Sequence, residues 1–311
     1  MTTSLPASRL RAVLTLPRLA LASVIVNVII VVTGGAVRLT GSGLGCPTFP
    51  SCGDGSLTPT RAFGVHGIIE FTNRQLTFVV VAVVIATLVV AVLDRREVRL
   101  ALLLAASIPA QALLGGITVL THLNPWTVAA HFMLSMVIIA VAFALWWRAS
   151  SHSSDLVSAP IRLAARMITA LTVAVLLLGT VVTGSGPHAG DADTSGKVHR
   201  TGLDVGSMSQ LHADAVMLLI GVSIGFAVLL RATDAARDLQ SATWLLVAVE
   251  LSQGLIGFVQ YFTQLPAVLV GFHMLGACLV WLAALEVAWR SRSVVASGDG
   301  TGRAWRSRGL Q

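Results

Sequence analysis

Eight long apolar runs constrain this chain more than any other feature of its sequence. A helix needs about 20 mostly apolar residues to cross a bilayer. The qualifying runs are residues 19–37, 68–93, 100–120, 128–147, 167–185, 209–230, 241–260 and 268–289. Charged residues make up only 11% of the 311 positions, whereas a soluble domain carries about 25%. The sequence therefore predicts an all-α polytopic membrane protein with eight transmembrane helices.

The segments between the runs are alternately rich and poor in basic residues. The rich class holds 16 of the 21 Lys and Arg residues and comprises the N-terminus, 94–99, 148–166, 231–240 and the C-terminal tail. The positive-inside rule assigns such segments to the cytoplasm, so we expect both termini there, in agreement with an even number of spans. Topology therefore accounts for the net charge of +7, and no nucleic-acid partner is expected. The first run lacks a small-residue cleavage site after it and is expected to be a spanning helix.

The two halves of the chain share an internal repeat. A shift of 142 residues superimposes the third and fourth runs on the seventh and eighth without a gap. The pairs brought together are Gln111 with Gln253, Leu113 with Leu255, Gly115 with Gly257, Thr121 with Thr263, Leu123 with Leu265, His131 with His273, and Trp147-Arg148 with Trp289-Arg290. Each half contains an even number of helices, so both insert in the same orientation. We expect two parallel four-helix repeats.

The repeat and the charge pattern together define the expected organisation. Its parts are a cytoplasmic N-terminus (1–18), a first four-helix half (19–148), a cytoplasmic linker (149–166), a second half (167–290) and a basic cytoplasmic tail (291–311). Two loops on the outer side, about 38–67 and 186–208, are too long for simple turns. Loops of such length are usually functional or disordered.

Three histidines lie near the outer end of helices that run inward, namely His131, His212 and His273. Ionisable residues inside a membrane are costly and usually mark function. Because His212 and His273 come from alternate helices at similar depth, they form a natural axial pair for haem iron. Zinc is the competing metal, but structural zinc takes four ligands, usually including cysteines. Only three cysteines exist, so haem is favoured.

The first half offers a less symmetric set of ligands. His131 is the equivalent of His273, but the residue equivalent to His212 is Asn73, and asparagine is a poor haem ligand. His66, one turn before Glu70, is a candidate second ligand if the helix starts early enough, and His122 is another. One haem held for electron transfer and one bound as substrate would suit an enzyme.

Glu70 lies at the outer end of the second run, one turn from Asn73 and close to Arg74. A carboxylate there can accept a proton or stabilise a developing positive centre beside bound haem. The alternative is an ion pair with Arg74 or Arg38 at the headgroup boundary. These two arginines can also bind haem propionates through charge-assisted hydrogen bonds.

Cys46 and Cys52 lie six residues apart in the outer-loop segment GCPTFPSC. On the oxidising side of a membrane this pair is expected to form a disulfide that closes a small loop. The bond would be either redox-labile and close to the haem or a structural link.

Several segments together resemble the haem A synthase family. They are GGAVRLTGSGLGCPTFPSC (34–52), IEFTNR (69–74), GGITVLTHLNPWTVAAHF (115–132), VTGSGPHAGD (182–191), LHAD (211–214) and the helix of His273. The resemblance implies that a methyl substituent of haem O is oxidised to a formyl group by successive hydroxylations, which gives haem A for terminal oxidases. One alternative is a di-haem b-type electron carrier linked to quinol. A transporter is disfavoured because Gly and Pro cluster mainly at the outer helix ends.

The resemblance also implies roles for individual residues. His212 and His273 would bind a resident haem b, His131 would ligate the substrate haem O, and Glu70 would be the catalytic carboxylate, while Cys46 and Cys52 match the family's cysteine pair. Asn73 is a departure, because the family commonly has histidine directly before the arginine. Expected partners are haem O, the synthase that supplies it, membrane lipid and a second copy of the chain. The cell membrane is the expected location, with the haem sites towards its outer face.

Overall fold

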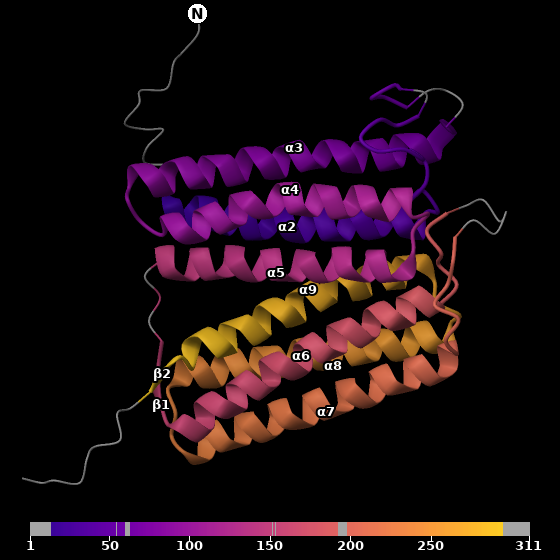
Figure 1. The fold of residues 1–311 in the computed structure, drawn as a ribbon. Coiled ribbons are helices and arrows are strands. Elements are labelled where there is room, and N and C mark those ends of the chain that lie inside the picture. Colours follow the sequence, from indigo (N-terminus) through magenta and orange to yellow (C-terminus); the bar gives the residue numbers. More distant parts are fainter. Residues whose placement is uncertain are drawn as a thin grey trace, which may run out of the picture.

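The computed structural model describes residues 14–53, 55–59, 63–150, 152, 154–191 and 198–294. This part of the chain contains eight long helices (Figure 1): α2 (Leu16–Leu39), α3 (Gly64–Leu93), α4 (Val98–Leu120), α5 (Pro125–Ala149), α6 (Ala159–Ser185), α7 (Val205–Ala232), α8 (Arg237–Phe262) and α9 (Ala267–Arg290). All eight are long and apolar enough to cross a membrane. The prediction of an all-α, multi-pass membrane protein is confirmed. Two-residue strands, β1 (Leu156–Val157) and β2 (Ser293–Val294), form a small parallel pair in addition.

The helices extend beyond the apolar runs at most of their ends. The largest difference is at α6, which begins at Ala159 rather than at residue 167, so that Arg162 and Arg166 lie on the helix and not in a linker. Pro160 stands in its first turn, where proline is favoured because its missing N–H would be unsatisfied anyway. The expected cytoplasmic ends fall mostly on residues 1–13 and 295–311, outside the described residues, as do Arg61 and Lys197.

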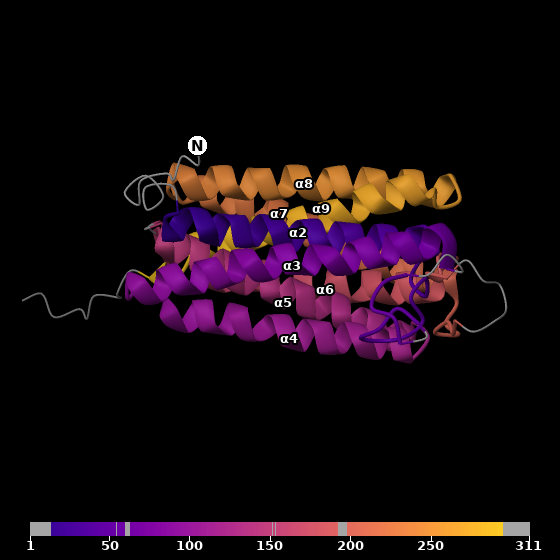
Figure 2. The same cartoon turned by 90° about the horizontal axis from the view of Figure 1, so that it is seen from above.

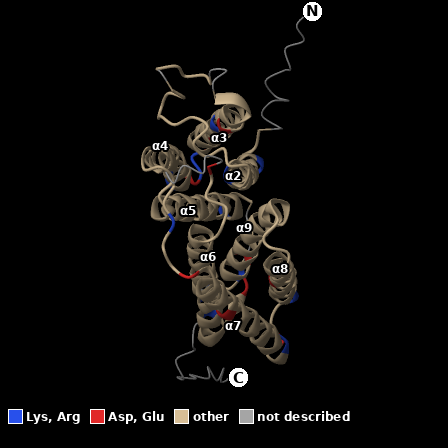
Figure 3. Cartoon of the chain, turned by 90° about the vertical axis from the view of Figure 1, so that its right-hand side faces the viewer, with Lys and Arg blue, Asp and Glu red and all other residues tan. Residues whose placement is uncertain are grey.

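The helices form two groups, which Figure 3 shows in a view along their axes. In the first group α2 packs against α3 and α5, and α4 packs against the same two helices. In the second group α6 and α8 each pack against α7 and α9. Consequently α3 lies diagonally across from α5, and α7 lies diagonally across from α9. That the two groups are repeats of one another stays a prediction.

Helix α9 connects the two groups, because it also packs against α2 and α5. The indole Nε1 of Trp281 donates a hydrogen bond of 2.9 Å to the carbonyl of Met136 on α5. On α2, a Cβ added to Gly35 would collide with the side chain of Met274. Lipid removes most of the hydrophobic drive for helix association, so close approach at small residues and interhelical hydrogen bonds hold such bundles together.

The two long connections, 40–63 and 186–204, leave the bundle at the same end, which we call the long-loop end (Figures 1 and 2). There the two loops contact each other. Ser42 forms an isolated antiparallel bridge with Asp191, and the Gly43 amide donates to the Gly190 carbonyl at 2.7 Å. The loops therefore join the first half of the chain to the second.

Candidate functional site

Four polar side chains lie within about two or three turns of the long-loop end. They belong to α3, α5, α7 and α9, and each lies beside a glycine of the preceding helix. A Cβ built on the glycine would lie 3–4 Å from the polar side chain in every case. The pairs and distances are Gly34 with Asn73 Nδ2 (3.9 Å), Gly115 with His131 Cε1 (3.0 Å), Gly179 with His212 Cε1 (3.3 Å) and Gly257 with His273 Cε1 (3.7 Å). The three predicted histidines thus occupy equivalent positions, and Asn73 occupies the fourth.

Together with Gln111 and Gln253, these four side chains fall into two sets, one in each group of helices, which we call clusters. The first-half cluster consists of Asn73, Gln111 and His131, and the second-half cluster consists of His212, Gln253 and His273. Gln111 Nε2 donates to the His131 carbonyl at 3.1 Å and to Ser135 Oγ at 2.6 Å.

In the second-half cluster, the side-chain amide of Gln253 lies against Gly276, one turn after His273. His212 and His273 lie on α7 and α9, which are diagonal in their group.

Buried polar atoms without a hydrogen-bond partner among the described residues concentrate in these clusters. They are Asn73 Oδ1, Gln111 Oε1 and His131 Nδ1 in the first, and His212 Nδ1, Gln253 Oε1 and His273 Nδ1 in the second. An unsatisfied buried donor or acceptor costs about 1–3 kcal/mol, and folded proteins contain few of them. Such a concentration indicates sites that a polar ligand or a metal centre completes.

Capping residues set the depth of two of the histidines. The side chain of Asn124 accepts a hydrogen bond from the Trp126 amide at the start of α5, and Asp204 accepts one from the Ser207 amide at 2.7 Å at the start of α7. The bonds from Ser207 hold the pKa of Asp204 below its ordinary value. Asparagine and aspartate are preferred caps because they satisfy a free helix N–H. His131 and His212 each follow about two turns later.

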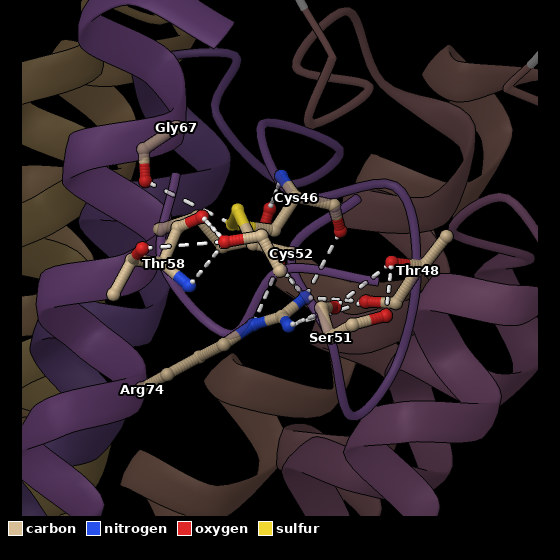
Figure 4. The surroundings of a disulfide bond; sticks show 9 residues. Cys46, Thr48, Ser51, Cys52, Thr58, Gly67 and Arg74 are labelled. Carbon is tan, nitrogen blue, oxygen red and sulfur yellow. Dashed lines mark hydrogen bonds and ion pairs between the residues drawn. A yellow bond between two sulfur atoms is a disulfide. The ribbon is translucent and has the colours of Figure 1, made fainter. Parts of the chain in front are cut away.

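Cys46 and Cys52 form the predicted disulfide, in a loop folded over the start of α3 (Figure 4). Glu70 lies beneath this loop with only 5% of its surface exposed. Its Oε2 accepts a hydrogen bond from the Cys46 amide at 2.7 Å, and its Oε1 pairs with Arg74. The ion pair with Arg74, the alternative considered for Glu70, is therefore present.

Arg74 contacts the disulfide loop (Figure 4). It also pairs with Glu70. Its guanidinium donates to the carbonyls of Cys46 at 2.9 Å, of Thr48 at 3.2 Å and of Ser51 at 3.2 Å. Glu70, Arg74 and the loop form one hydrogen-bonded unit. To bind a haem propionate, Arg74 would have to give up some of its bonds to Glu70 and the loop carbonyls. The propionate contact of Arg74 stays a prediction.

We expect Arg74→Lys to loosen the disulfide loop. A lysine ammonium is a compact charge that cannot reproduce the planar fork of guanidinium donors, so several loop carbonyls would lose their partner. The measurement is the rate at which a water-soluble thiol reduces the disulfide, which should rise several-fold. Arg231→Lys, at an exposed position on the last turn of α7, is the matched control. Equal reduction rates in both variants would contradict this role of Arg74.

Arg38 and Arg200 meet where the two halves join. Arg38, in the last turn of α2, and Arg200, in the second long loop, both donate to the carbonyl of Thr183, at 3.2 Å and 2.8 Å. Arg38 Nε is buried without a partner, and burial lowers the pKa of Arg200. In the described part of the chain, neither guanidinium forms an ion pair with a carboxylate. Two adjacent cations of this kind favour an anionic ligand. Arg200 was not predicted, because only loop folding brings it beside Arg38.

The remaining candidates are less central. His66 Nδ1 hydrogen-bonds Ser42 Oγ at 2.9 Å, and His122 is exposed in the turn after α4. A hollow of about 360 Å³ lies at the opposite end of the helices, lined partly by Trp147 and Trp289, and contains none of the predicted site residues. Within the described ranges, no group of three or more His, Cys, Asp or Glu residues could hold a metal ion.

Comparison with known proteins adds one match. The sequence profile of a family described as cytochrome oxidase assembly protein, COX15-CtaA, matches residues 17–195. This stretch is more than half of the chain and includes the Glu70 unit and the first-half cluster. No curated protein matches the chain. The protein belongs to the COX15-CtaA family of cytochrome oxidase assembly proteins, which is the haem A synthase family.

Proposed function

We propose that this protein is an enzyme that converts haem O into haem A by oxidising a methyl substituent to a formyl group in successive hydroxylations. The observation that carries the proposal is the pair of clusters near one end of the bundle. One cluster contains two imidazoles, and the other contains a single imidazole together with Asn73, which follows the buried Glu70 by one helical turn on α3. This asymmetry suits one haem that stays bound and one that is exchanged as substrate and product.

The donor set of the second-half cluster fits a resident haem b. His212 and His273 would hold its iron, and the Nδ1 atom of each is buried without a hydrogen-bond partner among the described residues. The two residues lie on diagonally opposed helices. Gly179 and Gly257 keep space beside each ring, since a Cβ there would contact the imidazole. When bound, haem b supplies one-electron transfer.

The first-half cluster would bind the substrate. His131 would ligate the iron of haem O, with Gln111 holding the backbone and side chains around it. Glu70 would hold or accept a proton at its carboxylate, one helical turn from Asn73. Arg38, with its free Nε, would bind a propionate, and Arg200 would add a second positive charge.

The long-loop end would face the outer side of the cell membrane and both termini the cytoplasm, as the positive-inside rule predicts. Haem O would arrive from the synthase that makes it. A second copy of the chain would be a further partner.

The direct test is to express the full chain in cells that make haem O but lack their own haem A synthase. Extracted haems are then separated by chromatography. Haem A in the extract supports the proposal, whereas an extract with unconverted haem O and only haem b on the purified protein contradicts it. That second result would favour the di-haem electron carrier.

Gly115→Ala should weaken haem binding in the first half. The added Cβ would lie 3.0 Å from His131 Cε1, and overpacking of this kind costs about 1–3 kcal/mol, which corresponds to roughly 5- to 150-fold in affinity. The measurement is a titration with haem O followed by absorption. Gly221→Ala is the matched control, because a Cβ at Gly221 would meet nothing within 4 Å. Equal affinities in the two variants would contradict the placement of haem beside His131.

A further inference from the structure

At the long-loop end, Asn73 places a carboxamide beside the glycine of the preceding helix, where His131, His212 and His273 place imidazoles. We propose that Asn73 leaves the iron of the first-half haem with one protein ligand, His131. The coordination position on the α3 side then takes a small exogenous ligand, to which the Asn73 carboxamide can donate a hydrogen bond. The inference rests on the proposed function only in that the first-half cluster must bind haem.

Asn73 has the location of a ligand but not the chemistry of one. It lies on α3 beside Gly34 of α2, as His212 lies on α7 beside Gly179 of α6. Helices α3 and α5 are diagonal in the first group, and α7 and α9 are diagonal in the second. The placement of Asn73 relative to His131 therefore corresponds to the placement of His212 relative to His273. Protein ligands of haem iron are His, Cys, Met or Tyr side chains. A carboxamide is not among them.

Among the described residues of the first half, none of the other candidates, His66, His122 and Glu70, replaces the missing imidazole. His66 is seven residues before Asn73, about 10 Å further along the helix axis, and its Nδ1 is bonded to Ser42. His122 is exposed beyond the end of α4. Glu70 already uses both carboxylate oxygens, one with the Cys46 amide and one with Arg74.

The carboxamide is nevertheless available to a bound ligand. Asn73 Oδ1 is buried and has no hydrogen-bond partner among the described residues, so the side chain is not committed to a structural bond through that atom. Hydrogen-bond donors and steric access on the open side of a haem decide what its iron binds. Asn73 can supply an N–H donor there, which an imidazole bound to the iron could not do.

The test uses the purified full chain loaded with haem O, kept anaerobic, reduced with dithionite and exposed to carbon monoxide. Total haem is measured first by the pyridine haemochrome method, with His131→Ala as the reference for a protein lacking the first-half haem. We expect carbon monoxide to change the spectrum of the first-half haem only, and the oxidised haem at this site to give a high-spin signal. In Asn73→His the carbon monoxide response should fall more than about tenfold and the oxidised signal should become low-spin, because a second imidazole closes the position.

Asn73→Leu separates the open position from the hydrogen bond. This apolar side chain of similar size should keep carbon monoxide binding but shift the C–O stretching frequency, since the donor is gone. Unchanged stretching frequency in Asn73→Leu would overturn the hydrogen-bonding role.

The outcomes distinguish the inference from the proposed function. A loaded first-half haem that is low-spin and unreactive towards carbon monoxide would overturn the inference, even in a protein that makes haem A. A carbon monoxide response unchanged in Asn73→His would overturn it too. A first-half site that binds no haem would overturn both the inference and the proposed function. A reactive first-half haem in a protein that yields no haem A would leave the inference standing and remove only the function.

Discussion

His273→Ala is expected to remove the resident haem from the second-half cluster. An alanine offers iron no ligand, and loss of a direct ligand should cost more than the roughly 10- to 100-fold affinity change that follows loss of a supporting residue. Alanine is a strong helix former, so α9 should still span the membrane. The measurement is the reduced-minus-oxidised absorption spectrum of the purified protein, in which the b-type band of the second half should be missing.

Two comparisons make the result for His273 interpretable. His199→Ala changes an exposed histidine of the second long loop and should leave the spectrum unchanged. Free imidazole added to the His273→Ala protein should restore part of the band, because it can occupy the space that the side chain left. A normal b-type spectrum in His273→Ala without imidazole would show that His273 is not a ligand.

Glu70→Gln is expected to lower haem A formation by about 10²- to 10⁴-fold, the usual contribution of a residue in general acid–base catalysis. Glutamine has nearly the same shape and can still accept the hydrogen bond from the Cys46 amide. The disulfide loop and haem binding should therefore survive while the proton-accepting carboxylate is lost. Product is measured by haem chromatography, and bound haem by absorption.

The control for Glu70 is Glu286→Gln. Glu286 pairs with Arg290 at the same spacing of four residues and lies at the opposite end of the bundle, so a general effect of breaking such a pair would appear in both variants. We expect normal product formation from Glu286→Gln. Undiminished haem A from Glu70→Gln, in cells without another synthase, would contradict a catalytic role for Glu70.

The sequence was sufficient to predict all eight spans, because apolar length alone decides which segments can cross a bilayer. It placed the start of α6 too late, since Arg162 and Arg166 made the first turns look like a linker. Long basic side chains can keep their charge in water while their stems cover apolar surface. A helix can therefore begin well before its apolar run does.

The site was only partly predictable. His131 and His273 were predicted from an ungapped match between two helix pairs, and the disulfide from its expected compartment and its spacing. The glycines beside the imidazoles, the bonds from Arg74 to the loop carbonyls and the meeting of Arg38 with Arg200 depend on how separate segments pack. Sequence spacing carries no information about such contacts between distant segments. Gln111 and Gln253 were visible as a repeated pair, but their place beside the histidines was not.

The backbone bond between Gly43 and Gly190 has a mechanical consequence for the protein. Together with the bond from the Arg38 guanidinium on α2 to the Thr183 carbonyl on α6, it ties the two groups of helices at the end where both clusters lie. Neither bundle can tilt there without pulling on the other. A displacement of one group at this end would therefore act on the other, and a fragment comprising either half alone would lose that constraint.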